Sequence, residues 1–292
     1  MTYPAQDKPL SIRIFWQTAR TDGEKQTVAN VLLPGLKILG DDVAISHADY
    51  EPCDVAVIIF SPRKNDAPTT GAARYVRNLH GPNLLILETP LFRQCPLWRS
   101  RLGFDHVHRG GRFGPASCPP DRFETLGLSV APWRTDGEAL VVAGQVADDY
   151  SLDGIDIDEW AVHVVRHLKS AGYANVVFRP HPLGDPGAVN SMQAVCGVEI
   201  SSESLDVDLQ RAGHWISYSS GSAIDAVLAG VPSLTLSRFN FAWEVSRHSI
   251  RHVNHPIFPD RMEWLSRLAY AQWSDDEIRL GLAWRNLRPF VI

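Results

Sequence analysis

Residues 216–226 read Ile-Ser-Tyr-Ser-Ser-Gly-Ser-Ala-Ile-Asp-Ala, which is the strongest local signal in the sequence. An apolar run, a turn of small residues and a second apolar run predict a strand that leads into a helix from Ser222 to Leu228. Ser222 and Asp225 have the spacing of a capping box. Backbone N–H groups at such a helix start can bind phosphate, although a capped helix without any ligand has the same sequence. The candidate phosphate-binding residues are Ser219, Ser220, Gly221 and Ser222.

Short apolar runs alternate with amphipathic segments on both sides of this stretch, which predicts an α/β fold with parallel sheets. Strands are predicted at residues 12–16, 43–46, 55–60, 84–87, 139–143, 175–178, 214–217 and 233–236. Further helices are predicted at residues 26–39, 71–79 and 158–171. Pro34 should kink or divide the first of these helices. Ligands of open α/β sheets bind at the carboxyl ends of the strands, so the loops there are the candidate sites.

The pattern indicates two Rossmann-like domains, at residues 1–134 and 135–272. A polar, turn-like stretch at 132–137 marks the boundary between them. The preceding residues, 88–132, are rich in Arg, Gly and Pro and predict a long irregular excursion. Two C-terminal helices with apolar faces are expected at residues 260–272 and 274–287. We expect the last segment, 273–292, to pack back on the N-terminal domain.

The composition excludes several classes of protein. Hydrophobic residues make up 45% of the 292 residues, which is enough for a substantial core. The net charge of −5 disfavours a DNA-binding protein with a basic surface overall. Neither a transmembrane run nor a signal-peptide pattern is visible. The four cysteines have the spacing of neither a zinc site nor a disulfide framework, so we expect a reduced, cytoplasmic protein of unknown oligomeric state.

A second loop, Arg179-Pro180-His181-Pro182, directly follows the predicted strand at 175–178. The two prolines hold the backbone extended on both sides of His181. A rigid histidine beside phosphates can stabilise a departing nucleotide. The alternative is that His181 is a packed structural residue.

A third loop, from Gln145 to Ser151, follows the predicted strand at 139–143. An aspartate at the carboxyl end of this strand can act as a base or a nucleophile at an anomeric carbon. A solvated loop that leads into a helix cap is the alternative. The acids of the region also suggest a metal site, but they lack the spacing of a calcium loop, and we expect no metal. These acids are Asp148, Asp149, Asp153, Asp156 and Asp158.

In this order, the three loops resemble motifs of the capsule-polysaccharide synthesis family of bacterial Kdo transferases. The family's Gln-x-x-x-Asp segment corresponds to Gln145–Asp149, with Ser151 following, and its His-Pro pair corresponds to His181-Pro182. Its Ser/Thr-rich turn before a helix that ends in Gly-x-Pro corresponds to Ser219–Pro232. The chain departs from the family at Ile224-Asp225, where the family's helix carries a Glu. The segments Asp260–Trp284 and Asp121–Arg134 look more like glycosyltransferase-like proteins of bacteriophages.

The resemblance implies a GT-B fold, in which two Rossmann-like domains face a cleft and the C-terminal helices brace the two. It implies a nucleotide-sugar donor, linked to CMP or alternatively to UDP, and no separate cofactor. Asp149 would be the catalytic carboxylate and His181 a phosphate contact. The donor cradle implied by the family contains Ser219, Ser220 and Ser222. We assign the remaining loop residues, Gln145, Ser151, Arg179 and Gly221, to donor binding as well.

Residues outside the three loops are further candidates. Arg238 and Glu244 follow the predicted strand at 233–236, where they could reach ribose or sugar hydroxyls. Glu88 follows the strand at 84–87 and is a candidate base or acceptor contact, or the ion-pair partner of Arg93 or Arg99.

Residues 93–122 contain six arginines, which is notable in a chain of net charge −5. We expect this basic segment to bind a polyanionic acceptor, either an acidic surface glycan or duplex DNA with hydroxymethyl-pyrimidines, the substrate of phage DNA modification. Within it, Arg109-Gly110-Gly111-Arg112 should be mobile and able to approach a polyanion closely. A solvated loop with scattered ion pairs is the alternative. The acceptor-binding candidates are Arg93, Arg109 and Arg112.

The sequence therefore predicts a glycosyltransferase of the cytoplasm of a bacterium or a phage-infected host. A non-catalytic nucleotide- or glycan-binding protein and a sugar-nucleotide epimerase or hydrolase on the same fold are the alternatives.

Overall fold

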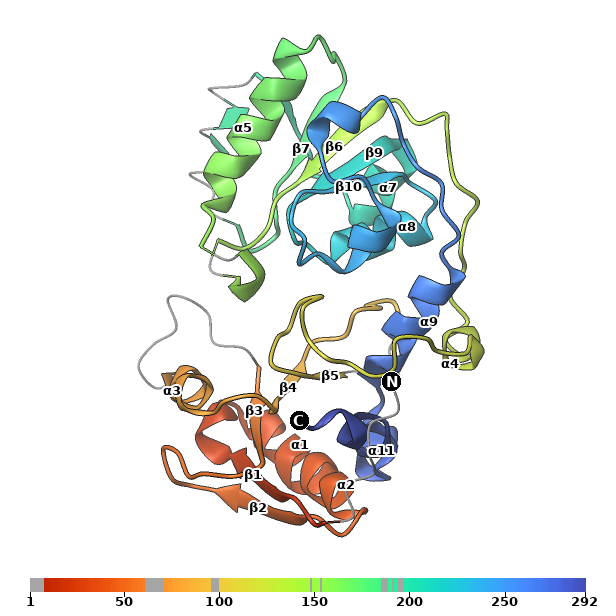
Figure 1. The fold of residues 1–292 in the computed structure, drawn as a ribbon. Coiled ribbons are helices and arrows are strands. Elements are labelled where there is room, and N and C mark those ends of the chain that lie inside the picture. The colour runs from red at the N-terminus through yellow and green to blue at the C-terminus, as the bar shows by residue number, and fades with distance from the viewer. Residues whose placement is uncertain are drawn as a thin grey trace. The chain divides into compact units, whose positions relative to one another are not determined.

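The computed structural model describes residues 8–60, 71–95, 100–147, 149–152, 154–184, 189–190, 192–193 and 197–292. The chain divides into two compact units (Figure 1). Unit 1 contains Met1–Gly127 and Leu265–Ile292, and unit 2 contains Leu128–Trp264. These bounds lie several residues away from the domain ends that the sequence suggests at residues 134 and 272.

Unit 1 is built on a six-stranded sheet with the strand order β11-β5-β4-β3-β1-β2. Its strands are β1 (Ser11–Phe15), β2 (Asp42–Ser46), β3 (Val55–Ile59), β4 (Leu84–Glu88), β5 (Ser100–Phe104) and β11 (Gln272–Trp273). The first four are parallel and match the predicted strands. β5 and β11 pair antiparallel at one edge. The sheet is therefore mixed, and the prediction of irregular structure throughout 88–132 is wrong at β5 and at α4 (Asp121–Thr125).

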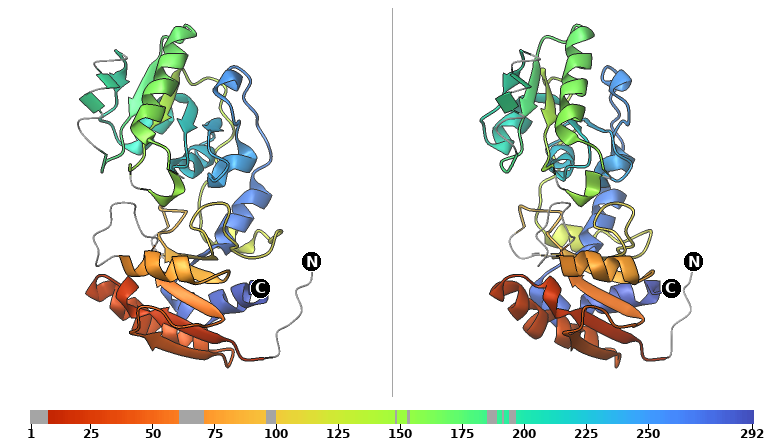
Figure 2. Two further views of the ribbon diagram at one scale, coloured as in Figure 1. Left: turned by 60° about the vertical axis from the view of Figure 1, so that its left-hand side comes forward. Right: turned by 90° about the vertical axis from the view of Figure 1, so that its left-hand side faces the viewer.

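Helices cover both faces of this sheet (Figures 1 and 2). A continuous helical stretch consists of α1 (Asp22–Thr27), a π-helical turn (Val28–Leu32) and α2 (Leu33–Lys37). The wider π turn ends two residues before Pro34, which has no N–H to donate. The helical stretch nevertheless runs on through Pro34, so the predicted kink or division stays a prediction. Val28, Leu32 and Leu36 pack on the sheet strands. On the other face, α3 (Gly71–Leu79) contacts β3.

The C-terminal residues complete the core of unit 1. After α9 (Met262–Tyr270), which Asp260 caps through the N–H of Met262, the chain forms α10 (Asp275–Arg279) and α11 (Leu282–Leu287). The sequence predicts a single helix over residues 274–287 that begins with a capping box at Ser274. The structure has this capping box at the start of α10. Gly281 divides that helix, because its backbone adopts the left-handed conformation with φ 74°. Gln272, placed in a helix by the sequence pattern, belongs to β11 instead.

Unit 2 is built on a five-stranded parallel sheet with the order β10-β9-β6-β7-β8. Its strands are β6 (Ala139–Ala143), β7 (Val176–Arg179), β8 (Glu199–Ile200), β9 (Ala212–Ser217) and β10 (Ser233–Thr235). Its helices are α5 (Ile157–Ser170), α7 (Leu205–Arg211) and α8 (Ser222–Leu228). α5 packs on one face of the sheet, and α7 and α8 pack on the other (Figures 1 and 2). This agrees with the predicted Rossmann-like α/β class. The sequence analysis did not predict the short strand β8 or the short helix α7.

Two glycines allow β6 and β9 to approach closely at their starts. A Cβ added at Gly137 would lie 2.3 Å from the carbonyl oxygen of Ala212, and one added at Gly213 would lie 2.1 Å from that of Gly137. Only glycine fits on either side of this contact, and the register between the two strands shifts next to it, between Ala139 and Leu140.

The described cysteines are free thiols, and burial raises the pKa of Cys53 and Cys118 to about 11. Neither of these two is a thiolate at neutral pH. Within the described ranges, no helix has both the length and the apolar character that crossing a membrane requires.

His80 is buried in unit 1 between Tyr50 and the backbone of β3. The N–H of Ala56 donates to its Nε2 over 3.2 Å, so the proton of the neutral ring lies on Nδ1, 3.3 Å from the Tyr50 hydroxyl oxygen. Burial lowers the pKa of His80 below its usual 6.5. Protonation of His80 would put a proton on Nε2, so that two N–H donors, that of the ring and that of Ala56, would face each other.

We expect the protein to lose thermal stability between about pH 7.5 and 5.5. The unfolded chain takes up the proton at a higher pH than the folded His80 does, so stability present above pH 6.5 falls as the pH falls. Burial also lowers the pKa of His106 and His214, which add to the effect. The measurement is the unfolding temperature across this range for the parent and His80→Gln, with the exposed His163→Gln as control. A variant as pH-sensitive as the parent would contradict the assignment to His80.

Candidate active site at the carboxyl edge of the second sheet

The three predicted loops of unit 2 lie side by side at one edge of its sheet. β7 and β9 both pair parallel with β6, so the loops after these three strands leave the sheet at the same end. Gln145 follows β6, His181 follows β7 and Ser219 follows β9. β10 is parallel to β9, which brings the segment with Arg238 and Glu244 to the same edge. This is the position where open α/β sheets bind ligands.

Gln145, Asp149, Ser151 and Ser219 form a closed hydrogen-bonded group at this edge. The buried Gln145 amide donates to the hydroxyl oxygens of Ser151 (2.9 Å) and Ser219 (3.0 Å). The Ser151 hydroxyl lies 2.6 Å from Asp149 Oδ1 and 2.8 Å from the Ser219 hydroxyl. The backbone N–H of Ser151 also donates to Asp149 Oδ1, over 2.8 Å. Residues from two loops therefore hold one carboxylate in place.

The directions of these hydrogen bonds can be assigned from their chemistry. An ionised carboxylate only accepts, so the single proton of the Ser151 hydroxyl points at Asp149. The Gln145 amide donates to both serine hydroxyls, and the Ser219 hydroxyl has two acceptors within reach, Ser151 Oγ at 2.8 Å and Gln145 Oε1 at 3.2 Å. Among the described residues, both hydrogen bonds to Asp149 reach Oδ1, and the aspartate side chain is exposed. Within the described ranges, Oδ2 therefore has no hydrogen-bond partner.

The turn at residues 219–222, called the serine turn below, differs in detail from the prediction. Gly221, not Ser222, is the N-cap residue of α8, and the Ser222–Asp225 capping box does not form. The Ser222 hydroxyl is buried and accepts from the indole N–H of Trp215 over 3.1 Å. The sequence pattern could not anticipate this, because Trp215 points inward from β9 and competes for the hydroxyl.

The backbone of this turn also changes which N–H groups are available to a ligand. The N–H groups of Ser222, Ala223 and Ile224 bond within the turn. In the part of the chain that the structure describes, the N–H groups of Ser220 and Gly221 make no hydrogen bond. A phosphate at this turn would therefore meet the N–H groups of Ser220 and Gly221 rather than the first turn of the helix.

Asn240 is a positioning residue that the sequence analysis missed. Its buried amide donates to the carbonyl oxygens of Tyr218 (3.2 Å) and Ser220 (3.3 Å), and its Oδ1 accepts from the N–H of Ala242. Asn240 thus holds the backbone of the serine turn in place through two of its carbonyl groups. An isolated asparagine after a strand gives no sequence signal, since its role depends on the return of the chain after β10.

His181 lines a hollow of about 420 Å³, together with the rest of the Arg179–Pro182 loop and residues 201–203. The N–H of Leu183 donates to His181 Nδ1 over 3.1 Å, which places the ring proton of the neutral histidine on Nε2. The serine turn does not line this hollow. His181 and the turn nevertheless follow the two strands that flank β6.

Arg179 has a structural role that the sequence did not reveal. It forms an ion pair with Asp208, whose side chain is fully buried, and donates to the carbonyl oxygen of Glu203 over 2.7 Å. Burial raises the pKa of Asp208, but hydrogen bonds from Ser201, Arg179 and Arg211 outweigh it and keep the pKa below its usual value. One nitrogen of the Arg179 guanidinium, Nη1, is thus used within the protein, and the predicted contact of Arg179 with the donor stays a prediction.

The two candidates after β10 are exposed. The guanidinium of Arg238 lies over the ring of Phe239, 4.8 Å from its centroid, and Glu244 lies in a 3-10 turn, Phe241–Val245. They flank Asn240, which bonds to the serine turn, and their predicted contact with the donor stays a prediction.

The basic residues of unit 1 do not form one mobile cationic segment. Arg112 pairs with Asp105 over 2.7 Å and donates to Asn83 and to the backbone of Phe290. Arg122 pairs with Glu277 over 2.6 Å, and Arg101 donates to two backbone carbonyls. The guanidinium groups of these three arginines are bonded within unit 1. Of the three, only Arg112 belongs to the stretch 109–112 for which mobility is expected, and its side chain is held by these contacts. Arg93 and Arg109 are exposed, and Arg99 lies outside the described residues.

Glu88 ends β4 in unit 1, and its Oε1 accepts from the N–H of Thr89 over 2.8 Å. Asp148 and Asp153 of the acidic loop lie outside the described residues. Across the described ranges, no three His, Cys, Asp or Glu side chains are grouped so that they could hold a metal ion.

The fold is similar to that of a solved structure titled as a β-Kdo 2,7-transferase, KpsC of Thermosulfurimonas dismutans. The TM-score is 0.54 at 16% sequence identity, over 95% of this chain and 99% of that chain. A second structure, titled as a β-Kdo 2,4-transferase of the same organism's KpsC, gives 0.48 at 14% identity, over 90% of each chain. No protein-family model and no curated protein matches the sequence. The first similarity shows that this chain shares the α/β fold of a Kdo transferase.

Proposed function

We propose that this protein is a metal-independent glycosyltransferase of the GT-B type. It moves a sugar from a nucleotide-sugar donor, linked to CMP or UDP, to a hydroxyl of an acceptor. The observation that carries the proposal is the hydrogen-bonded group of Gln145, Asp149, Ser151 and Ser219 at the carboxyl edge of the sheet. The fold shared with a Kdo transferase supports the same conclusion.

Asp149 is suited to the chemical step of this reaction. Ser151 fixes one carboxylate oxygen through two hydrogen bonds, so the other oxygen has a defined direction. That oxygen either takes the proton of the acceptor hydroxyl, while this hydroxyl attacks the anomeric carbon, or attacks that carbon itself. In both cases the bond from the anomeric carbon to the phosphate oxygen breaks, and the electron pair leaves with the nucleotide. In the second case the acceptor hydroxyl then displaces Asp149 from the anomeric carbon, and its proton goes to the released carboxylate.

The serine turn and His181 are suited to receive that leaving group. The N–H groups of Ser220 and Gly221 are oriented donors for phosphate oxygens, and the Ser219 side chain links this turn to Asp149 through Ser151. His181 presents its Nε2 proton as a further donor. Gln145 connects the phosphate side of the site to its carboxylate side, so the buried amide keeps both at a fixed separation.

The test of the donor site is a thermal-shift screen with CMP, UDP, GDP and ADP. A nucleotide present at about 100 times its Kd stabilises the folded protein by about 2.7 kcal/mol, which raises the unfolding temperature by several degrees. We expect CMP or UDP to give this shift. Ser219→Ala should reduce it, whereas Ser170→Ala, an exposed serine on α5, should not. If none of the four nucleotides stabilises the protein, the proposed donor site is wrong.

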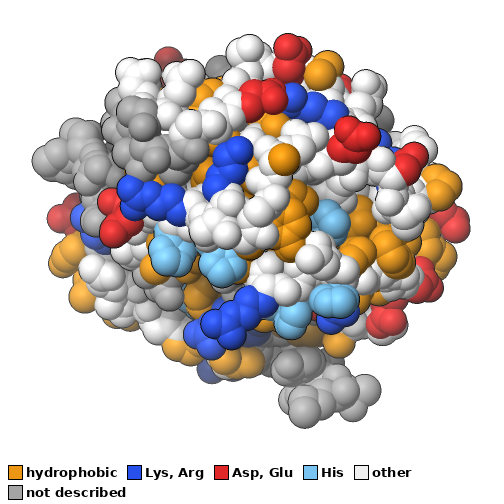
Figure 3. Space-filling model, turned by 90° about the horizontal axis from the view of Figure 1, so that it is seen from above, with side chains coloured by type: hydrophobic (Ala, Val, Ile, Leu, Met, Phe, Trp, Pro, Cys, Tyr) orange, Lys and Arg blue, Asp and Glu red, His pale blue; other side chains and the backbone are white. Residues whose placement is uncertain are grey.

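The acceptor is either a surface glycan or hydroxymethylated duplex DNA. The exposed Arg93 and Arg109 remain candidates for binding an anionic acceptor, but Arg112 is held by Asp105. Basic side chains also occur outside residues 93–122. On the face in Figure 3, histidines gather with Arg and Lys in the middle, and acidic side chains lie mainly toward the rim. Binding of both acceptor classes across a salt series separates them, because duplex DNA gives the steeper dependence.

A further inference from the structure

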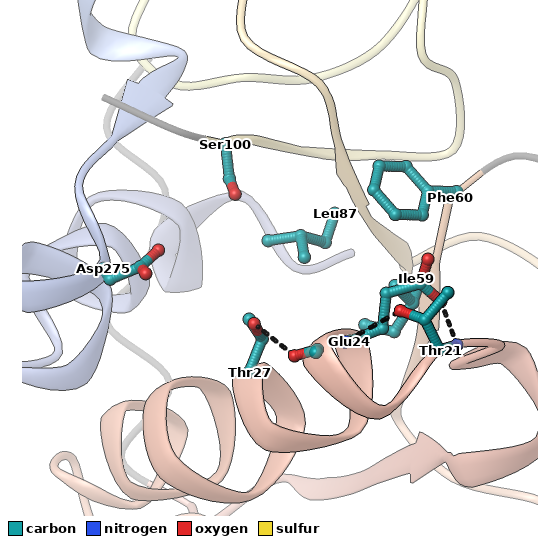
Figure 4. Close-up of a pocket in the computed structure, with 9 residues that line it drawn as sticks. Thr21, Glu24, Thr27, Ile59, Phe60, Leu87, Ser100 and Asp275 are labelled. Carbon is teal, nitrogen blue, oxygen red and sulfur yellow. Dashed lines mark hydrogen bonds between the residues drawn. The ribbon is translucent and has the colours of Figure 1, made fainter. Parts of the chain in front are cut away.

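Unit 1 contains a hollow of about 300 Å³ at the carboxyl end of β3 and β4 (Figure 4). Its wall is formed by the first helical stretch, by the ends of the two strands, and by Ser100 of β5 and Asp275 of α10. All of these residues belong to unit 1. A volume of this size lies at the small end of the range for ligand sites and accommodates about one sugar ring.

The lining combines an apolar surface with hydroxyl and carboxylate groups. Ile59, Phe60 and Leu87 supply the apolar part. Phe60 has φ 60°, which is uncommon for an aromatic residue, and its N–H is held by the carbonyl oxygen of Leu87 over 2.8 Å. The polar part consists of Thr21, Glu24, Thr27, Ser100 and Asp275.

Ser100 is the observation that points to a ligand. Its side chain is 8% exposed, and among the described residues its hydroxyl makes no hydrogen bond. Figure 4 shows this hydroxyl directed into the space between Leu87, Thr27 and Asp275. A hydroxyl that faces the hollow without a protein partner among the described residues can donate to, or accept from, a hydroxyl group of a bound ligand.

The charge of the lining defines the ligand class. Among the described residues that line the hollow, Glu24 and Asp275 are carboxylates, and none is a lysine or an arginine. Glu24 is held in a capping box with Thr21, so its charge is fixed at the wall. Carboxylates disfavour phosphate or carboxylate ligands and accept hydrogen bonds from hydroxyl groups. The apolar side chains suit the C–H face of a sugar ring.

We propose that this hollow binds one uncharged saccharide ring, as the acceptor end of a glycan. The acceptor role rests on the proposed glycosyltransferase function, whereas binding of the ring does not. Ser100 and Thr27 are the hydroxyls that select the ring by hydrogen bonding. An uncharged acceptor ring at this place differs from the polyanion that the arginine content of residues 93–122 suggests.

The experiment is ligand-observed NMR binding to the full chain without any nucleotide. The probes are methyl β-glucopyranoside, methyl β-galactopyranoside and N-acetylglucosamine as uncharged rings, with glucuronate and inorganic phosphate as anions. The variants are Ser100→Ala and Thr27→Val, and the control is Thr125→Val, which loses a similar hydroxyl bond to a backbone carbonyl elsewhere in unit 1. Circular dichroism confirms that each variant is folded.

We expect at least one uncharged ring to bind and each variant to weaken it about two- to tenfold, while the control binds like the parent. Binding of the anions alone, absence of binding up to about 50 mM of every uncharged ring, or affinities unchanged in both variants would overturn the proposal. If one variant fails to fold, the other variant and the comparison of uncharged rings with anions still test the proposal. The nucleotide screen reports on unit 2 separately, so failure of the donor site and failure of this hollow are distinguishable.

Discussion

Asp149→Asn should lose glycosyl transfer by a factor of about 10²–10⁴, while the fold and nucleotide binding are retained. Asparagine has the size of aspartate, and its carbonyl oxygen can still accept from the N–H and hydroxyl of Ser151. It cannot take a proton from an acceptor hydroxyl or attack an anomeric carbon. The side chain is exposed, so removal of its charge should change the free energy of unfolding by no more than about 0.5 kcal/mol.

The measurement is turnover of the donor that the nucleotide screen identifies, together with the thermal shift that its nucleotide produces. Asp156→Asn is the matched control, since Asp156 is an exposed acid close by in the chain that caps α5. Asparagine caps helices as well as aspartate does, so this variant should keep both activity and stability. Turnover at the parent level in Asp149→Asn would move the catalytic role elsewhere, and Glu88 would be the first residue to test.

The sequence predicts all the parallel strands of both sheets except the two-residue β8, for a simple physical reason. Strands such as Val55–Ile59 and Ala139–Ala143 are buried on both faces, so they appear as short continuous apolar runs. The same logic places the candidate loops correctly relative to the sheet. Gln145, His181 and Ser219 each directly follow a strand, and parallel pairing brings them to one edge.

Features that depend on distant partners could not be predicted. β11 has two residues and pairs with β5, far away in the sequence, so its pattern carries no signal. Ser222 has the spacing of a capping residue but bonds to Trp215 instead. The arginines of 93–122 give the same lesson, because Arg122 pairs with Glu277, 155 residues further along the chain. Local charge counts do not show which cations are already neutralised.

Asp41 is the buried carboxylate that ties the C-terminal segment to the first strand of unit 1. Its side chain is fully buried and accepts from the N–H of Leu10 (2.9 Å), the indole of Trp284 (2.7 Å) and the guanidinium of Arg288 (2.8 Å). Burial raises the pKa of Asp41, but these hydrogen bonds outweigh it and lower the pKa below the usual value. The stability that it contributes should therefore be present at neutral pH and lost as the pH falls below about 4.

Asp41→Ala should accordingly lower the free energy of unfolding by about 3–5 kcal/mol, since it leaves the Arg288 guanidinium and two N–H donors without their acceptor. The neighbouring Asp42→Ala is the matched control. The Asp42 side chain is 68% exposed and pairs with Arg13 at the surface, so its loss should cost less than about 1 kcal/mol. Urea denaturation followed by circular dichroism measures both. If the two variants lose similar stability, the Asp41 cluster does not fasten the C-terminal segment, and the apolar contacts of Trp284 and Leu287 carry that role alone.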